Sequence, residues 1–568
     1  MRTLNYNEDL CVVGGGLAGL CAAIAAARHG IKVVLIQDRA VLGGNASSEI
    51  RMWVGGAYRM GAEGIADLRE SGIIEELFLE NFYQNPALKY PIWDSVLYEK
   101  AKGEENITLL LNTSCLDAEM DGNRIVSVKA WQSNAETFHS VKAKYFADCS
   151  GDSILSTLTG AKFMYGREAK ADFGESIPPE VADKKTMGMS CLFQIRETDH
   201  KCPFTPPTWA YKYETDADLP FKDHHKNDNF WWIEIGGEWD CIHDTDKCRD
   251  ELLKICYGVW DHMKNKGDHD VDNWELEWIG FLPGKRESRR YIGKYIVTQN
   301  DVEAEGRFED IVAYAGWSMD DHFPEGFYYT KGHPTIYHRA PQPWGLPLRC
   351  MISENIENLT FAGRNISVTH AALSSCRVIA TCATLGQALG TAIAQAVSDN
   401  TSIDAIDIKK LQATLLSDDS YIPWHEREVS SLTKSAICSS EVVRNGRDRG
   451  EDNLWRGKSG DFIEYKFDTD TPVSEIRLVF DSDLNRKYHN MPCNYPLVQT
   501  KFKLPNTLIR EYIIEGESES GERVSIHITD NHQRFVKHRV DWQVKSLKFI
   551  PILTHGCDEF RLFDLELN

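Results

Sequence analysis

The sequence predicts an α/β protein in which a parallel, dinucleotide-binding sheet is interrupted by an inserted α+β segment and followed by an all-β domain. Three observations lead to this fold class. A glycine-rich turn joins a strand to a helix near the N-terminus, a strand–loop–helix pattern lies between residues 345 and 400, and mainly strand-like runs follow residue 440. At 568 residues the chain is long enough for several domains, each with its own core.

The first fifty residues contain one complete βαβ pattern. It predicts a buried strand, an Ala-rich helix and a second parallel strand, at residues 10–13, 20–28 and 31–36. Between the first strand and the helix, Gly14, Gly16 and Gly19 have the G-x-G-x-x-G spacing of dinucleotide-binding sheets. Gly14 permits the tight turn, Gly16 lets the backbone approach a pyrophosphate, and Gly19 lets the helix pack on the strand. The helix N-terminus offers N–H groups and a positive dipole end to the phosphates.

The residue at the end of the second strand usually is an acid that binds the adenosine ribose. Gln37 occupies this position here and Asp38 follows it, and either side chain can accept a hydrogen bond from a ribose hydroxyl. The neighbouring acid disfavours a ribose 2′-phosphate, whereas Arg39 would favour one.

A second glycine pair, Gly43-Gly44, follows this strand. NAD-binding sheets have no general need for it, but the segment resembles the loop that runs beside the flavin in the glutathione reductase and fumarate reductase superfamily. The resemblance implies FAD contacts at Gly43, Gly44, Asn45, Ser48 and Arg51. No His follows the pair closely, which implies that FAD is bound non-covalently.

Two later segments resemble further motifs of the same superfamily. An apolar strand ends at Asp148 and leads into Ser150-Gly151-Asp152, and residues 358–378 form a strand and turn before a helix of small residues, 378–396. The N-terminus of that helix would stabilise an anionic reduced flavin. The motifs together imply a Rossmann-like FAD-binding domain over residues 1–164 and 345–425. The implied FAD contacts are Gly14, Gly16, Leu17, Ala18, Gly19, Gln37, Asp38, Arg39, Gly43, Gly44, Asn45, Ser48, Arg51, Ser150, Gly151, Asp152, Gly363, Arg364, Arg377 and Val378.

Residues 165–344 are rich in aromatic residues and are interpreted as an inserted substrate-capping domain. Aromatic rings suit both a plain β core and a site that stacks on sugar rings. The run 283–291 holds four cations and resembles an R-E-S-R-R segment of the same oxidoreductases. In that setting Arg286 and Arg289 would hold a substrate anion or a developing negative charge. The alternative is a solvated charged face. If the run is helical, arginines three or four positions apart would share one side.

His370 is the preferred candidate for acid–base catalysis, because a neutral imidazole can take a hydroxyl proton as a hydride leaves. The alternative is a capping or core histidine. His322 and His333 are further candidates.

The C-terminal residues 440–568 predict a β-sandwich, because short strand-like runs alternate with turns. The opening of this segment resembles discoidin-like, galactose-binding jelly rolls. The resemblance implies glycan binding, packing on the catalytic body or an oligomer interface.

Composition excludes several classes of function. A net charge of −22 argues against binding of nucleic acid or an anionic membrane surface. The 15 cysteines include no C-x-x-C pair, which argues against a disulfide reductase, and no metal site is predicted. No apolar run reaches the roughly 18 residues of a membrane span. The polar start predicts a cytoplasmic protein, or a periplasmic or secreted one if a leader preceded it.

These observations lead to three hypotheses. The first is an FAD-dependent oxidoreductase that moves a hydride between a small polar substrate, such as a carbohydrate or glycoside, and flavin N5. The second is redox-neutral cleavage of a glycoside through a transient keto sugar. The third is a glycan-binding protein with structural FAD. The expected partners are a small-molecule or glycan substrate, an electron acceptor that the sequence does not identify, and in an oligomer a second copy of the chain.

Overall fold

The computed structural model describes every residue except 58–66, 268 and 487–502. The described residues form two compact units. One unit contains residues 1–57 and 88–408, and the other contains residues 67–87, 409–486 and 503–568.

The first unit is built on a seven-stranded sheet with the order β3-β2-β1-β6-β5-β4, in which β18 also pairs with β6. Strands β1, β2, β3, β6 and β18 are parallel, whereas β4, β5 and the first half of β6 form an antiparallel meander. This arrangement confirms the predicted parallel, Rossmann-like sheet. The strands are β1 (Arg2–Val13), β2 (Val33–Ile36), β3 (Ile107–Leu110), β4 (Thr113–Asp121), β5 (Arg124–Gln132), β6 (Thr137–Asp148) and β18 (Leu359–Phe361).

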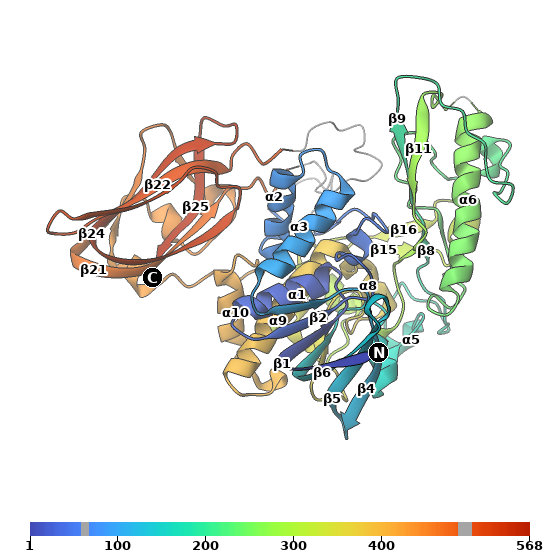
Figure 1. The fold of residues 1–568 in the computed structure, drawn as a ribbon, viewed down its shortest axis with the longest axis horizontal. Coiled ribbons are helices and arrows are strands. Elements are labelled where there is room, and N and C mark those ends of the chain that lie inside the picture. Colours follow the sequence, from blue (N-terminus) through green and yellow to red (C-terminus); the bar gives the residue numbers. More distant parts are fainter. Residues whose placement is uncertain (58–66, 268, 487–502) are drawn as a thin grey trace. The chain divides into compact units, whose positions relative to one another are not determined.

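Helices of small residues pack closely against this sheet (Figure 1). Helix α1 (Leu17–Arg28) is buried along its length except for its last residue, and α9 (Ile379–Ser398) lies against it. The two backbones approach because Gly386 and Gly390 lack side chains: a Cβ on either would lie 2.0 or 2.1 Å from a carbonyl oxygen of α1. The remaining helices that accompany this sheet are α3 (Tyr90–Gly103), α4 (Ile154–Thr159) and α8 (His370–Cys376).

The inserted segment surrounds the 21-residue helix α6 with short strands and loops. Its aromatic residues mostly form a core, with Phe230, Trp232, Trp260 and Trp274 all buried in one cluster. The run 283–291 is not helical; it contains two short strands separated by bends. The elements are β7 (Phe163–Met164), α5 (Lys170–Phe173), β8 (Met189–Ser190), β9 (Phe193–Glu197), η3 (Asp216–Asp218), β10 (Glu234–Ile235), α6 (Thr245–Asn265), β11 (Trp274–Ile279), β12 (Gly284–Lys285), β13 (Arg290–Tyr291), α7 (Gln299–Glu303), β14 (Ile311–Ala315), β15 (Met319–His322), η4 (Gly326–Tyr328), β16 (Thr335–His338) and β17 (Trp344–Pro347).

The second unit combines helix α2 with the C-terminal strands. The strands are antiparallel, with the order β20-β25-β21-β24-β22-β23 and β19 beside β21. One of these strands, residues 463–480, is longer than the short runs that the sequence predicts, and its register shifts midway. The elements are α2 (Ile73–Gln84), α10 (Ile408–Ser417), α11 (Ser431–Ser435), β19 (Ile437–Cys438), β20 (Trp455–Gly457), β21 (Ile463–Phe480), β22 (Ile509–Glu517), β23 (Arg523–Ile528), β24 (Phe535–Thr554) and β25 (Phe560–Leu567).

Among the described residues, no single helix has the length and apolar composition of a membrane span. By length and composition alone, α8 and α9 satisfy that criterion as a pair bent by 94°.

Candidate active site

A cavity of about 460 Å³ opens where β1, β2 and β6 end. Four predicted segments line it together: the first glycine-rich turn, the end of β2, the second glycine pair and the turn after β6. The residues around the start of α9 complete the wall. The predicted contacts that line the cavity are Gly14, Gly16, Leu17, Ala18, Gln37, Asp38, Arg39, Gly43, Gly44, Asn45, Ser150, Gly151, Asp152, Gly363, Arg364 and Arg377.

Four predicted contacts do not line this cavity. Gly19 serves packing, since a Cβ there would lie 1.9 Å from the carbonyl oxygen of Gly14. The Ser48 amide donates to a carboxylate of α3, and the Arg51 guanidinium lies over two aromatic rings and donates to Gln194. Val378 caps α9, and the next residue, Ile379, lines the cavity instead.

The glycine-rich turn leaves room for a ligand's phosphates. Gly14 has φ +107°, and a Cβ on it would lie 2.4 Å from the backbone of Cys149. Gly16 forms a bridge with Gly43, which brings both glycine segments together. Gly16 is also the N-cap of α1, and no described side chain caps this helix. Its first N–H groups are therefore free to bind an anion.

Gln37 supports the turn from within. It is buried, its Oε1 accepts a hydrogen bond from the Gly15 amide at 2.7 Å, and its Nε2 donates to the Val41 carbonyl at 3.1 Å. Asp38 lines the cavity with a side chain that is 60% exposed, and it lies 3.6 Å from Arg39.

Asp152 is the centre of an ion-pair group on the cavity wall. Its carboxylate binds Lys285 Nζ at 2.7 Å and Arg364 Nη2 at 3.0 Å, and it accepts from Ser288. Burial acts to raise the pKa of Asp152, but the two cations outweigh it and hold the pKa well below the usual range.

Sequence reasoning missed several residues of the cavity. Lys285 lies in the cationic run, but the sequence does not single it out as a cofactor contact. Residues 113–115, at the corner between β3 and β4, carry no motif. Only the pairing of distant strands brings them to this wall. The position of Lys285 has a visible cause, since Asn45 Nδ2 donates to its carbonyl and ties the second glycine pair to the insert.

The cavity fits an anionic dinucleotide such as FAD. Two of its cations have buried nitrogens without a hydrogen-bond partner in the described part of the chain. They are Nε of Arg377 and Nη1 of Arg39, although the latter lies 3.7 Å from the Glu49 carboxylate. Buried donors of this kind are costly unless a ligand satisfies them. Together with the uncapped start of α1, they suit phosphate oxygens and polar edges of a flavin ring.

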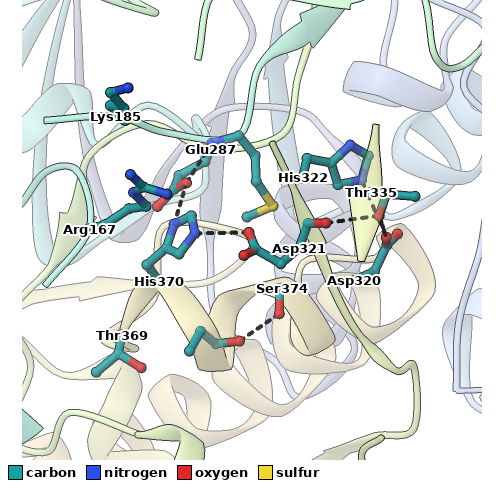
Figure 2. A network of polar contacts seen from close by, with 12 residues as sticks. Arg167, Lys185, Glu287, Asp320, Asp321, His322, Thr335, Thr369, His370 and Ser374 are labelled. Carbon is teal, nitrogen blue, oxygen red and sulfur yellow. Dashed lines mark hydrogen bonds and ion pairs between the residues drawn. The ribbon is translucent and has the colours of Figure 1, made fainter. Parts of the chain in front are cut away.

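His370 begins helix α8 and lies between two carboxylates (Figure 2). Its Nδ1 is 2.9 Å from Glu287 Oε2 and its Nε2 is 3.1 Å from Asp321 Oδ1. Glu287 also lies 3.3 Å from Arg290 and accepts from the Met187 amide. The carboxylate of Asp321 retains 19% exposure, whereas the side chains of His370 and Glu287 are almost completely buried.

The surroundings of His370 favour an imidazolium over the neutral base expected from the sequence. Burial lowers its pKa, but Glu287 and Asp321 outweigh burial and raise the pKa to about 10. An imidazole with a carboxylate on each nitrogen is protonated at neutral pH. Such an imidazolium can stabilise negative charge and orient Asp321, whose partly exposed carboxylate can accept a proton.

A second charged cluster surrounds His322. Its Nδ1 is 2.6 Å from Glu234 Oε2, and Arg286 Nη1 lies 3.4 Å from the same oxygen. The other ring nitrogen lies 3.5 Å from Asp320. Arg377, which lines the cavity, donates to the carbonyl of Asp320 at 3.2 Å. Arg377 and Asp320 therefore connect the cavity wall to the cluster around His322.

The two predicted catalytic arginines have different environments. Arg286 is buried and donates to Ser190 Oγ and the Trp231 carbonyl, beside His322. Arg289 lies over the ring of Phe163 on β7, and no described contact joins it to His370 or His322. The turns between β12 and β13 point successive side chains in different directions. Arg290, which the sequence does not single out as a catalytic candidate, binds Glu287 and Glu168 in place of Arg289.

Solved structures show only distant likeness. The chain is 12% identical to a geranylgeranyl bacteriochlorophyll reductase-like protein from Thermoplasma acidophilum, covering 73% of this chain and 85% of that chain with a TM-score of 0.33. It is also 12% identical to the flavin-dependent brominase Bmp2. This match covers 73% of this chain and 86% of that chain, with a TM-score of 0.33. A family 32 carbohydrate-binding module from Streptococcus pneumoniae EndoD is 9% identical. This match covers 22% of this chain and 83% of that chain, with a TM-score of 0.18. No curated protein matches significantly.

The profile of the family described as FAD dependent oxidoreductase matches residues 9–415. This range contains the parallel sheet, both glycine segments, the cavity and the acid–base residues. The chain therefore belongs to the FAD-dependent oxidoreductase family, and FAD is its cofactor.

Proposed function

We propose that this enzyme oxidises a hydroxyl-bearing carbon of a small polar substrate, a carbohydrate or glycoside. The supporting observation is the position of Asp321, a partly exposed carboxylate held by the His370 imidazolium next to residues that contact the cavity wall. The cavity residues would hold FAD, which would supply the hydride acceptor for this oxidation, with an external electron acceptor as co-reactant.

The protein residues handle the proton of the substrate hydroxyl. Asp321 accepts it, while the ion pair between His370 and Glu287 fixes the carboxylate in place. Burial acts to raise the pKa of Asp321, but its hydrogen bond to His370 lowers the pKa, so the carboxylate stays ionised at neutral pH. Arg286 and Arg377 supply positive charge for the polar groups of the substrate.

Two tryptophans support a sugar as the substrate. Trp231 is partly exposed and meets the ring of His322 edge-on at 5.6 Å. Trp317 is partly exposed and its Nε1 lies 3.4 Å from Asp320. Aromatic rings beside carboxylates and guanidinium groups suit a ligand with both apolar faces and hydroxyl groups.

Anaerobic mixing of the FAD-loaded enzyme with monosaccharides and glycosides tests this function. Net bleaching of the flavin supports oxidation. We expect Asp321→Asn to slow bleaching by about 10² or more, because the amide cannot accept the proton. Asp199→Asn is the matched control, since that carboxylate is fully exposed. Equal bleaching rates in Asp321→Asn and the wild type would remove Asp321 from the mechanism.

Redox-neutral cleavage of a glycoside is the second candidate. Elimination next to a transient ketone needs another proton-transfer group, and His322 with Glu234 offers one in the same region. Bond cleavage without an external electron acceptor would favour this reaction over net oxidation. If no sugar causes bleaching or cleavage, a glycan-binding role with structural FAD is favoured.

A further inference from the structure

Three histidines and one aspartate converge in the inserted segment, away from the residues described above. They are Asp216 on η3, His224 in the following loop, His262 near the end of α6, and His269 just after that helix. One possible ligand atom from each residue lies within 4.8 Å of all the others. Sequence reasoning predicted no metal site, because these residues have no short, regular spacing.

The distances from Asp216 to the three histidines are close to those of tetrahedral coordination. Asp216 Oδ1 lies 3.0 Å from Nε2 of His262, 3.5 Å from Nε2 of His224 and 3.6 Å from Nε2 of His269. Ligands about 2.0 to 2.1 Å from a tetrahedral zinc ion lie about 3.3 Å from one another. The three nitrogens therefore lie at suitable distances from Asp216 Oδ1 to share an ion with it, and all four atoms lie within 4.8 Å of one another.

Hydrogen bonds on the outer side orient two of the rings. His262 Nδ1 lies 3.0 Å from the Tyr213 carbonyl, and His224 Nδ1 lies 2.6 Å from the Lys222 carbonyl. A carbonyl can only accept, so each Nδ1 carries a proton and Nε2 is the atom left to face the centre. This is the arrangement that metal-bound histidines adopt. Nε2 of His262 donates to Asp216 Oδ1 at 3.0 Å in this structure, and this is the proton that a metal ion would replace.

The third ring provides an independent sign of a missing ligand. The His269 side chain is 9% exposed, and its buried Nε2 has no hydrogen-bond partner among the described residues. A Cβ on Gly267 would lie 2.6 Å from this nitrogen, so the glycine leaves the space around it open. A buried ring nitrogen without a partner is unfavourable unless an ion binds it.

We propose that Asp216, His224, His262 and His269 bind one Zn²⁺ ion with a structural role. Imidazole nitrogens favour zinc and related transition metals, whereas Ca²⁺ and Mg²⁺ prefer oxygen ligands. Four protein ligands leave no open position, as in structural zinc sites.

The ion would join segments that are distant in sequence. It links the loop that holds Asp216 and His224 to the C-terminal end of α6 and the turn beyond it. Lys222 in the same loop is buried, and its Nζ donates to the Tyr329 carbonyl at 2.8 Å, in the connection between β15 and β16. Strand β15 carries Asp321 and His322, so zinc would stabilise the segment that positions the acid–base residues.

Metal analysis of the full-length, FAD-loaded protein tests the proposal. After reconstitution with zinc and removal of excess ion, the wild type is expected to retain about one equivalent of zinc. His262→Gln and Asp216→Asn should retain far less. His243→Gln is the matched control, since His243 lies in the same segment with an 83% exposed side chain and should leave zinc content unchanged.

Two further measurements keep the result interpretable if His262→Gln folds poorly. A chelator should lower the unfolding temperature of the wild type and of His243→Gln, but not that of Asp216→Asn, whose side chain is exposed. Replacement of zinc with Co²⁺ should give the visible bands of a tetrahedral site. Reconstituted wild type without bound zinc, or with zinc retained equally in all variants, would overturn the proposal.

Discussion

Glu287 is a completely buried carboxylate between two cations, His370 and Arg290. Burial acts to raise its pKa, but these cations lower the pKa and keep the carboxylate ionised. A buried charge of this kind is stable only while its partners remain charged. The protonation of His370 therefore contributes to the stability of the fold.

This coupling predicts a pH-dependent stability. The pKa of His370 is raised from 6.5 to about 10 in the folded protein. The stabilisation of the fold by protonated His370 is therefore complete below about pH 6.5, declines between pH 6.5 and 10, and is lost above about pH 10. Unfolding temperatures of the wild type and His370→Gln should differ most near pH 6 and converge toward pH 10. A difference that stays constant over this range would contradict a protonated His370.

Gln37 and Asp38 are predicted to have separate roles in FAD binding. Both polar atoms of the Gln37 side chain are used by the protein backbone, so we expect Asp38 to accept the ribose hydroxyl. Asp38→Ala should raise the FAD dissociation constant about tenfold, whereas Asp38→Asn, which keeps an acceptor oxygen, should raise it less. Flavin fluorescence titration measures the FAD dissociation constants of both variants. Equal affinity of Asp38→Ala and the wild type would exclude this contact.

At the scale of elements, the contact between α1 and α9 fixes the position of two helix starts on the cavity wall. The start of α1 lines the cavity, and so does the start of α9. Gly386 and Gly390, about one turn apart, let the helices approach until backbone meets backbone. Small residues at this contact therefore control the geometry of both helix ends.

Gly390→Ala tests this contact. The added Cβ would lie 2.1 Å from the Ala22 carbonyl oxygen, so the helices must separate. We expect a loss of about 1–3 kcal/mol in the free energy of unfolding, measured by denaturant titration, and weaker FAD binding. Gly103→Ala is the control, because a Cβ at that helix end meets nothing within 4 Å. A Gly390→Ala protein as stable as the control would show that the contact is not tight.

At the scale of the whole molecule, residues 67–87 pack with the C-terminal strands, although the sequence domain 1–164 includes them. Within this second unit, Glu75 on α2 forms a completely buried ion pair with Arg486 at 2.6 Å. Burial acts to raise the pKa of Glu75, but Arg486 outweighs it and lowers the pKa. The pair joins segments more than 400 positions apart in the chain.

Removal of one partner should destabilise this unit strongly. We expect Arg486→Met to cost about 3–5 kcal/mol, because buried Glu75 loses its ion-pair partner and keeps the hydrogen bond from Ser482, and Glu75→Leu with Arg486→Met to recover much of the loss. Thermal unfolding followed by circular dichroism measures the effect. Arg523→Met removes an exposed pair with Glu517 and should change stability by less than about 1 kcal/mol. A similar small effect for Arg486→Met would contradict the buried pair.

The sequence by itself determined the βαβ unit and most of the cofactor cavity. Glycines at positions 14, 16, 43 and 44 meet local needs for tight turns and close approach to a ligand, and such needs can be recognised from neighbouring residues. The regular strand of residues 10–13 and the helix after it follow from local composition in the same way.

Only the tertiary structure decided which distant residues meet. Lys285 reaches Asp152, Asp321 reaches His370, and three histidines reach Asp216, across separations that no motif records. These contacts also set the chemistry. The same His370 that a sequence pattern suggests as a neutral base becomes an imidazolium, because two carboxylates lie within 3.1 Å of its nitrogens. The charge of a buried group depends on its neighbours in space, and the linear sequence does not specify them.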